Sequence, residues 1–281
     1  MNKKLIVANW KNHPDTLAEA EGILEFANDY LDSFLSAEAL AKEEGDKKEF
    51  SLVFCPPFVF IEKVAKILKM SHLEHQAELG AQDIATEDES ALTGEVSGRM
   101  LKKLGVRYVI VGHSERRWKL GESDEVVNKK VKAALRNELT PIVCVGERTR
   151  LSSASQNLGG QTSNWIVFLR QQTEAAFAGL KPDEVSRCII AYEPVWAIST
   201  TPGARPDTPE NALKSISVIK ETLNTKYLIQ NTICLYGGSV NSSNARSFLS
   251  KEEIDGVLIG GASVNKEEFV KILEIAINEP N

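Results

Sequence analysis

Three side chains that could move protons stand just beyond short apolar runs of this 281-residue sequence: Glu193, His113 and Lys11. A carboxylate can take a proton from carbon, and an imidazole can give a proton to an oxygen and take it back. An ammonium group can stabilise the negative charge that develops between the two steps. The sequence therefore predicts proton transfer beside a carbonyl group, provided that folding brings the three groups together.

Each of these residues also has a plain structural explanation when it is taken alone. A glutamate after a strand can cap a helix or pair with an arginine, a single histidine is often a satisfied core residue, and a single lysine is usually solvated. An ordinary pKa of about 4.3 would make Glu193 a weak base unless apolar neighbours desolvate its carboxylate. The residues after His113, Ser114–Arg117, predict the start of a helix, whose dipole disfavours an imidazolium ion.

Eight short runs of β-forming residues recur along the chain and are the elements that would position these groups. They are almost continuously hydrophobic, which is typical of strands covered on both faces in a parallel sheet. Helical patterns fill the gaps between the runs. In chain order, the predicted strands are Leu5–Ala8, Ser51–Phe54, Leu79–Gln82, Tyr108–Val111, Pro141–Val145, Cys188–Tyr192, Ile233–Tyr236 and Val257–Ile259.

Strand-then-helix units repeated in this way favour an α/β fold, a (β/α)8 barrel, with an open doubly wound sheet as the alternative. One barrel can accommodate residues 1–281 as a single domain. We expect Ser36–Lys48 and Leu151–Asn164 to be surface extensions of it, because both interrupt the repeating pattern. Catalytic groups of such a barrel lie at the C-terminal ends of its strands, which is where the three proton-transfer residues fall.

Composition and charge argue against several other classes of protein. A formal net charge of −6 is unfavourable for general nucleic-acid binding. No apolar run approaches the roughly 18 residues of a membrane span, and no signal-peptide pattern is present, so we expect a cytoplasmic protein. The sequence offers no complete set of metal ligands, and apolar surroundings predict buried free thiols for Cys55, Cys144, Cys188 and Cys234.

Six blocks of the sequence resemble, in order, the signature blocks of the triosephosphate isomerase family: ANWK, VGHSERR, GESDE, AYEPVWAI, YGGSV and GVLIGGAS. They run from Ala8 to Ser263 and so cover nearly the whole chain. The resemblance implies an enzyme that interconverts dihydroxyacetone phosphate and glyceraldehyde 3-phosphate through an enediol or enediolate, without a metal or an organic cofactor. It implies that Glu193 is the base, His113 the neutral proton shuttle and Lys11 the stabilising cation.

The same resemblance implies supporting roles around the reacting groups. Asn9 would donate a hydrogen bond beside Lys11, and Glu115 would pair with the lysine ammonium group. Ile198 and Leu258 match positions that close over the base when substrate binds, which would exclude water and raise the pKa of the carboxylate.

A phosphate site is also implied. Ser239, Gly260 and Gly261 would hold the phosphate, because glycines let backbone N–H groups approach an anion, and a short helix near Ala262–Ser263 would point its N-terminus at it. The backbone N–H of Ser199 would reach the same phosphate when the lid after Glu193 closes. This is how an acidic protein could bind an acidic substrate.

The sequence departs from the family pattern in the lid and near the expected subunit contact. Ser199 and Thr201 stand where the family has glycines, and the lid is about three residues longer than usual, which predicts altered closing kinetics. Glu147 and Tyr236 match positions that hold the lid open or closed. The resemblance implies a homodimer in which the loop Gln82–Glu95 enters the partner, although Asp83 replaces the family's asparagine.

Two other functions remain open. One is a catalytically silent protein that binds triose phosphate on the same scaffold, which the altered lid would suit. The other is a different phosphate-binding barrel enzyme, a lyase or a synthase. Retention of the base, the imidazole and the lysine together favours the isomerase.

Overall fold

The computed structural model describes residues 4–41, 50–71, 73, 76–89, 91–150 and 165–278. Within these ranges, eight parallel strands form a closed barrel in sequence order, and β8 pairs with β1. Closure confirms the (β/α)8 barrel and excludes an open doubly wound sheet. The strands are β1 (Lys4–Asn9), β2 (Phe50–Cys55), β3 (Ala77–Ala81), β4 (Tyr108–Val111), β5 (Thr140–Val145), β6 (Ile189–Tyr192), β7 (Cys234–Tyr236) and β8 (Gly256–Ile259).

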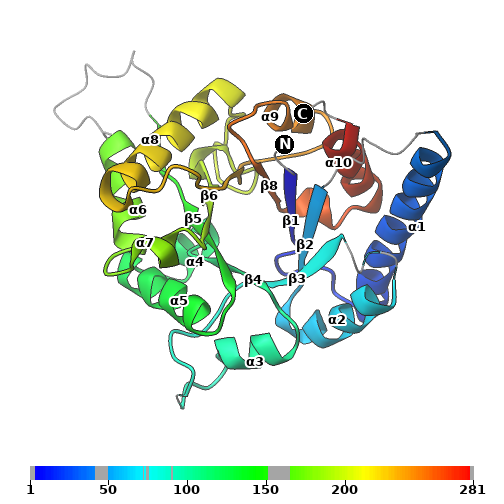
Figure 1. The fold of residues 1–281 in the computed structure, drawn as a ribbon, viewed down its shortest axis with the longest axis horizontal. Coiled ribbons are helices and arrows are strands. Elements are labelled where there is room, and N and C mark those ends of the chain that lie inside the picture. Colours follow the sequence, from blue (N-terminus) through cyan, green and yellow to red (C-terminus); the bar gives the residue numbers. More distant parts are fainter. Residues whose placement is uncertain are drawn as a thin grey trace.

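Helices surround the barrel, as Figure 1 shows. They are α1 (Leu17–Ala41), α2 (Ile61–Met70), α3 (Gly98–Lys103), α4 (Ser114–Lys119), α5 (Asp124–Arg136), α6 (Trp165–Ala176), α7 (Pro182–Val185), α8 (Pro209–Tyr227), α9 (Ala245–Leu249) and α10 (Lys266–Asn278). Short 3-10 helices occupy Phe58–Phe60, Val195–Ala197 and Gly261–Ser263. At the start of α8, the Thr208 side chain caps the helix by accepting a hydrogen bond from the Asn211 N–H at 3.3 Å.

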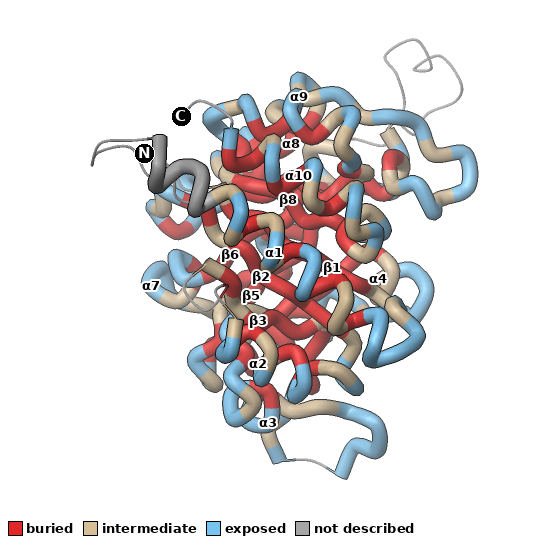
Figure 2. Tube along the Cα trace, turned by 90° about the vertical axis from the view of Figure 1, so that its right-hand side faces the viewer, coloured by how far each residue is buried: buried red, intermediate tan, exposed pale blue. Residues whose placement is uncertain are grey.

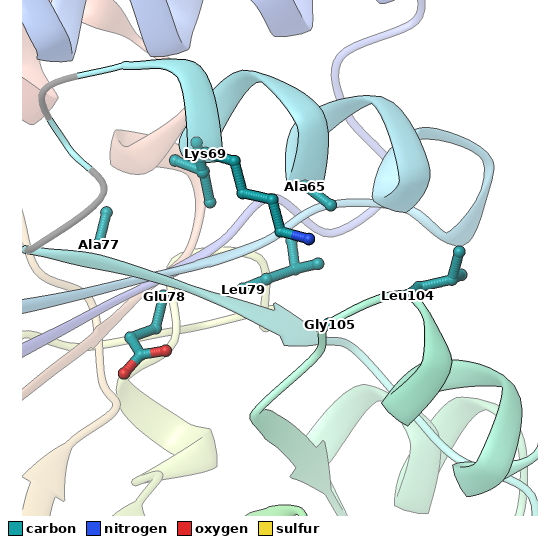
Figure 3. Close-up of a pocket in the computed structure, with 8 residues that line it drawn as sticks. Ala65, Lys69, Ala77, Glu78, Leu79, Leu104 and Gly105 are labelled. Carbon is teal, nitrogen blue, oxygen red and sulfur yellow. The ribbon is translucent and has the colours of Figure 1, made fainter.

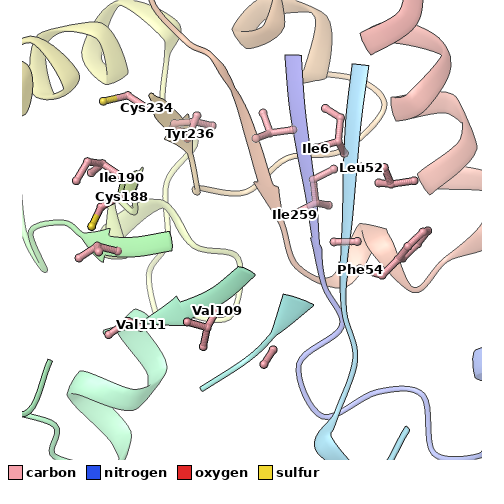
Figure 4. Packing of buried hydrophobic residues seen from close by; sticks show 14 of the residues in the cluster. Ile6, Leu52, Phe54, Val109, Val111, Cys188, Ile190, Cys234, Tyr236 and Ile259 are labelled. Carbon is pink, nitrogen blue, oxygen red and sulfur yellow. The ribbon is translucent and has the colours of Figure 1, made fainter. Parts of the chain in front are cut away.

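Successive residues of each strand face alternately into the barrel and outward to the helices. In β1, Leu5 and Val7 belong to an inner cluster, whereas Ile6 and Ala8 pack with helices in a larger outer cluster. Figure 4 shows this outer cluster, and Figure 2 shows buried strands at the centre with exposed residues on the outer faces of the helices. Both faces of each strand are therefore covered, which explains the continuous hydrophobic runs.

The third strand differs from its prediction. It spans Ala77–Ala81, so Gln82 lies just beyond it. The Gln82 side-chain amide donates hydrogen bonds to the backbone oxygens of Lys11 at 2.7 Å and Cys55 at 2.9 Å. This polar side chain serves to join the ends of neighbouring strands.

Two further expectations concern the thiols and the extensions. All four cysteines lie in the described ranges and are buried and free, as predicted. Of the predicted extension Ser36–Lys48, residues 36–41 continue α1, whereas residues 42–48 lie outside the described residues. The other predicted extension, 151–164, lies wholly outside them.

Candidate active site

The predicted proton-transfer residues meet at the carboxyl ends of three strands. Lys11 follows β1, His113 follows β4 and Glu193 directly follows β6. The parallel strands form a closed barrel (Figure 1) and so end on the same rim, which places Lys11, His113 and Glu193 at one mouth.

His113 and Glu193 are in direct contact. His113 is the N-cap of α4, and its Nδ1 accepts a hydrogen bond from the Glu115 N–H at 3.2 Å. An acceptor at Nδ1 leaves the ring proton on Nε2, which lies 2.9 Å from Glu193 Oε1. The other carboxylate oxygen of Glu193 accepts a hydrogen bond from the Ser114 N–H at 2.9 Å. The start of α4 therefore orients both the imidazole and the carboxylate.

Glycines leave the space in which Glu193 sits. A Cβ atom on Gly146 would lie 1.7 Å from the carbonyl oxygen of Glu193, and one on Gly237 would lie 2.9 Å from its Cγ. The Glu193 N–H donates to the Val145 carbonyl at 2.8 Å, so the end of β6 remains paired with β5. The carboxylate is 2% exposed, which places it in a largely water-free setting.

Lys11 is held by the residues expected near it. Its Nζ lies 3.1 Å from Glu115 Oε1. Burial acts to raise the pKa of Glu115, but the charge of Lys11 and its hydrogen bond hold it below its ordinary value. Asn9 Oδ1 accepts a hydrogen bond from the Lys11 backbone N–H at 3.0 Å, so in this arrangement the oxygen of Asn9, rather than its amide donor, faces Lys11. The Lys11 backbone has a φ of 53°, and the Asn9 contact supports this turn.

Of the residues expected to hold phosphate, Gly260 lies beside Lys11. A Cβ atom on Gly260 would lie 3.1 Å from Lys11 Cε, so the lysine side chain crosses over this glycine. The short 3-10 helix begins at Gly261, and its Ser263 hydroxyl donates to the Gly260 carbonyl at 2.7 Å. Ser239 is positioned by Asn244, whose side-chain amide donates to the Ser239 carbonyl at 2.8 Å.

Leu258 lies within β8, in the inner barrel cluster. It borders Gly237, which also borders the side chain of Glu193. Leu258 therefore supplies apolar surface near the carboxylate.

The lid segment after Glu193 rises from the mouth and is fixed at its start by Glu147. Trp196 Nε1 and the Tyr192 hydroxyl both donate to Glu147 Oε1 at 2.9 Å. Ile198 is partly buried, whereas Ser199 is exposed at the surface. In this arrangement, Ser199 is not enclosed with the buried carboxylate.

A buried charge network lies behind α4, and the sequence analysis did not find it. Lys130 Nζ lies 2.6 and 2.7 Å from the two carboxylate oxygens of Asp83 and 2.6 Å from Glu122 Oε1. Arg116 of α4 contacts the same two acids, at 2.8 and 2.6 Å. The network therefore ties α4 to the start of the loop after β3. Asp83 lies 47 residues from Lys130, so spacing gave no signal for that pair.

Arg117, the second arginine of the SERR motif, also supports the site. Its Nε donates to the Gly112 carbonyl at 2.6 Å and its guanidinium to the Cys144 carbonyl at 3.2 Å. These bonds join the ends of β4 and β5 beneath His113. In the sequence, the two adjacent arginines of this motif are the feature that could have indicated such support.

Other features lie apart from this mouth. A hollow of about 130 Å³ lies outside the barrel between α2, β3 and the end of α3 (Figure 3). Lys69 lies over it, while Glu78 points to the other side of β3, and none of the predicted site residues lines it. Across the described residues, no group of three or more metal-binding side chains occurs. No helix in the described ranges combines the length and apolar character needed to cross a membrane.

Comparisons with known proteins identify the family of this chain. The family model described as triosephosphate isomerase matches residues 4–276. A triosephosphate isomerase of Caldanaerobacter subterraneus subsp. tengcongensis is 39% identical over 273 residues, covering 97% of this chain and 99% of that protein. One from Synechococcus sp. (strain JA-2-3B'a(2-13)) is 39% identical over 280 residues, with both chains fully covered.

A solved structure of the same family resembles this fold along nearly its whole length. The crystal structure of triosephosphate isomerase from Bartonella henselae superposes with a TM-score of 0.75 at 29% identity, covering 97% of this chain and 98% of that one. The barrel, the geometry at its mouth and the near full-length matches agree, and the chain belongs to the triosephosphate isomerase family.

Proposed function

We propose that this protein is a triose-phosphate isomerase, which interconverts dihydroxyacetone phosphate and glyceraldehyde 3-phosphate. In the proposed mechanism, Glu193 takes a proton from the carbon beside the carbonyl group, and an enediol or enediolate forms. His113 donates its Nε2 proton to one substrate oxygen and recovers a proton from the other. Lys11 stabilises the negative charge on oxygen, with Asn9 and Glu115 holding it in place.

The contact between Glu193 Oε1 and His113 Nε2 at 2.9 Å is the observation that supports this proposal most directly. It puts a base and a proton donor within reach of adjacent atoms of one small substrate. Glu193 would exchange its bonds to His113 and Ser114 for contact with the substrate carbon.

Substrate binding is proposed to use the other side of the mouth. Ser239, Gly260 and Gly261 would hold the phosphate, and the Ser199 N–H would join them when the lid closes. Ile198 and Leu258 would then exclude water from the carboxylate. The position of Gly260 beneath the Lys11 side chain supports this arrangement, because the lysine would face both the phosphate and the developing oxyanion.

A coupled assay of triose-phosphate interconversion tests the proposal. We expect ready turnover by the wild type and a loss of about two to four orders of magnitude for Glu193→Asp, because withdrawing the carboxylate by about 1 Å misplaces the base. Glu78→Asp is a matched control, since Glu78 lies near the start of β3 and pairs with Arg107 away from the mouth. Binding without turnover by the wild type would instead support the silent phosphate-binding protein.

We further propose that the enzyme is a cytoplasmic homodimer in which the loop 82–95 enters the partner near Lys11. The hydrogen bond from Gln82 to the Lys11 carbonyl supports a link between that loop and the site. Light scattering on the purified protein tests the oligomeric state, and the mass of a single chain at micromolar concentration would contradict the dimer.

A further inference from the structure

The far end of the lid carries a carboxylate in an unfavourable setting. Asp207 directly precedes Thr208, the N-cap of α8, and its Oδ1 accepts a hydrogen bond from the Thr208 N–H at 2.8 Å. Its Oδ2 is buried and, within the part of the chain that the structure describes, has no hydrogen-bond partner. An ionised carboxylate in that position loses hydration, which the charge of Arg150 and the Thr208 and Asn211 contacts offset only in part.

The groups that face Asp207 come from the ends of three strands. Glu147 and Arg150 follow β5, Tyr192 ends β6 and Tyr236 ends β7. Burial, together with the neighbouring Asp207 carboxylate, raises the pKa of Tyr236. Glu147 Oε2 is a second buried oxygen that lacks a partner among the described residues. Two carboxylates therefore share one buried cluster with the guanidinium group of Arg150.

Both ends of the lid rest on this cluster. Near its start, Trp196 donates to Glu147 at 2.9 Å. Near its end, the Arg205 N–H donates to the Trp196 carbonyl at 3.2 Å, and the Arg205 guanidinium donates to the Arg150 carbonyl at 3.4 Å. The cluster is therefore where the resting position of the lid is decided, and Asp207 is its least satisfied member.

We propose that Asp207 is a positioning residue of the lid, whose ionised carboxylate destabilises the resting arrangement so that the end of the lid leaves this cluster readily. The inference rests on the proposed isomerase function, in which the lid moves over the substrate. A neutral side chain of the same shape at position 207 would hold the lid at rest.

Protonation of Asp207 determines the direction in which pH shifts the lid. Burial, reinforced by the charge of Glu147, raises the pKa of Asp207 from 3.8 to about 6 in the resting arrangement. A group whose pKa is raised in one arrangement favours that arrangement at low pH. The advantage is complete below the ordinary value of 3.8 and is lost as pH rises through about 6. If the moved lid exposes Asp207 to water, the ratio of resting to moved lid falls about tenfold between about pH 5 and pH 7.5.

Fluorine NMR on protein labelled with 5-fluorotryptophan can measure this ratio, with the Trp196 signal assigned from a Trp196→Phe variant. We expect the resting signal of the wild type to lose about tenfold in relative population from about pH 5 to pH 7.5. We expect Asp207→Asn to keep the resting signal throughout. Asp183→Asn, at an exposed carboxylate in the first turn of α7, should follow the wild type.

Binding of glycerol 3-phosphate provides a second measurement. At about pH 7.5, Asp207→Asn should bind this probe on the order of a hundredfold more weakly than the wild type, because more energy is needed to move its lid. Near pH 5, where more of Asp207 is protonated in the resting arrangement, the difference should narrow to about tenfold. Identical pH profiles for the wild type and Asp207→Asn would overturn the inference. If the variant does not fold, an unchanged wild-type signal between the same pH values would overturn it equally.

These outcomes are separate from the proposed function. Failure of turnover by the wild type would refute the isomerase proposal but would leave the fluorine spectra interpretable. A pH-independent lid in an active enzyme would refute the role of Asp207 alone.

Discussion

Replacing Lys130 with methionine tests the charge network behind α4. Lys130 Nζ makes three contacts of 2.6 to 2.7 Å with Asp83 and Glu122, and its side chain is only 4% exposed. Burial raises the pKa of Asp83 despite the nearby lysine. Burial also acts to raise the pKa of Glu122, but Lys130 and Arg116 hold it below its ordinary value. Without Lys130, two buried acids would share a single arginine.

We expect Lys130→Met to lower the free energy of unfolding by about 3–5 kcal/mol, the usual cost of removing one partner from a buried ion pair. At about 2–4 °C for each kcal/mol, the thermal midpoint should fall by at least about 6 °C. Urea denaturation followed by circular dichroism measures the first quantity, and calorimetry measures the second. The methionine has a similar length, so lost packing contributes little to the difference.

A second substitution separates charge from packing. Asp83→Asn in the Lys130→Met background removes one of the two excess acids, and we expect it to recover about 1–2 kcal/mol of the loss. Asp83→Asn alone should destabilise the protein, because it leaves two cations with one carboxylate. A loss below about 1 kcal/mol for Lys130→Met, or strictly additive effects in the double variant, would refute the account of the network.

Two further predictions concern the mouth of the barrel. Gly146→Ala should lower both the thermal midpoint and kcat, because its Cβ would lie 1.7 Å from the Glu193 carbonyl oxygen and force β5 and β6 apart. Gly261→Ala, whose Cβ would meet no described atom within 4 Å, is the control for the thermal midpoint, and equal midpoints would contradict the prediction. Ser199→Gly should change kcat and KM together in steady-state assays, since it restores backbone freedom to the lid. Unchanged constants would mean that the serine does not affect lid movement.

The fold was predictable because its strands have an unusually clear pattern. Ile6 and Val7 are both completely buried although they face opposite sides of the sheet, and such continuous runs have few explanations other than a covered parallel sheet. Repetition of strand and helix then favours a barrel. The predicted third strand ended one residue too late, at Gln82. The sequence does not show that the Gln82 side chain contacts Lys11 and Cys55 beyond the strand end.

The reacting groups of the candidate site could be predicted from the sequence, but several of the residues that position them could not. Glu193, His113 and Lys11 stand where strands end, and that position is visible in the sequence. The network of Lys130 and Asp83 joins residues that are 47 positions apart, and no local pattern predicts such a pair. The burial of Asp207 depends on three strand ends that meet around it, so a sequence that shows only a polar loop residue could not reveal it.

The two hydrogen bonds from Gln82 have a consequence for how the mouth responds to disturbance. One amide links the tops of three adjacent strands, so the height of the Lys11 turn is set by the segment that leaves β3. Glu193 takes its position instead from β5, β6 and the first turn of α4. A subunit neighbour pressing on residues 82–95 would therefore tune the electrostatics felt by a substrate oxygen and leave the base itself largely undisturbed.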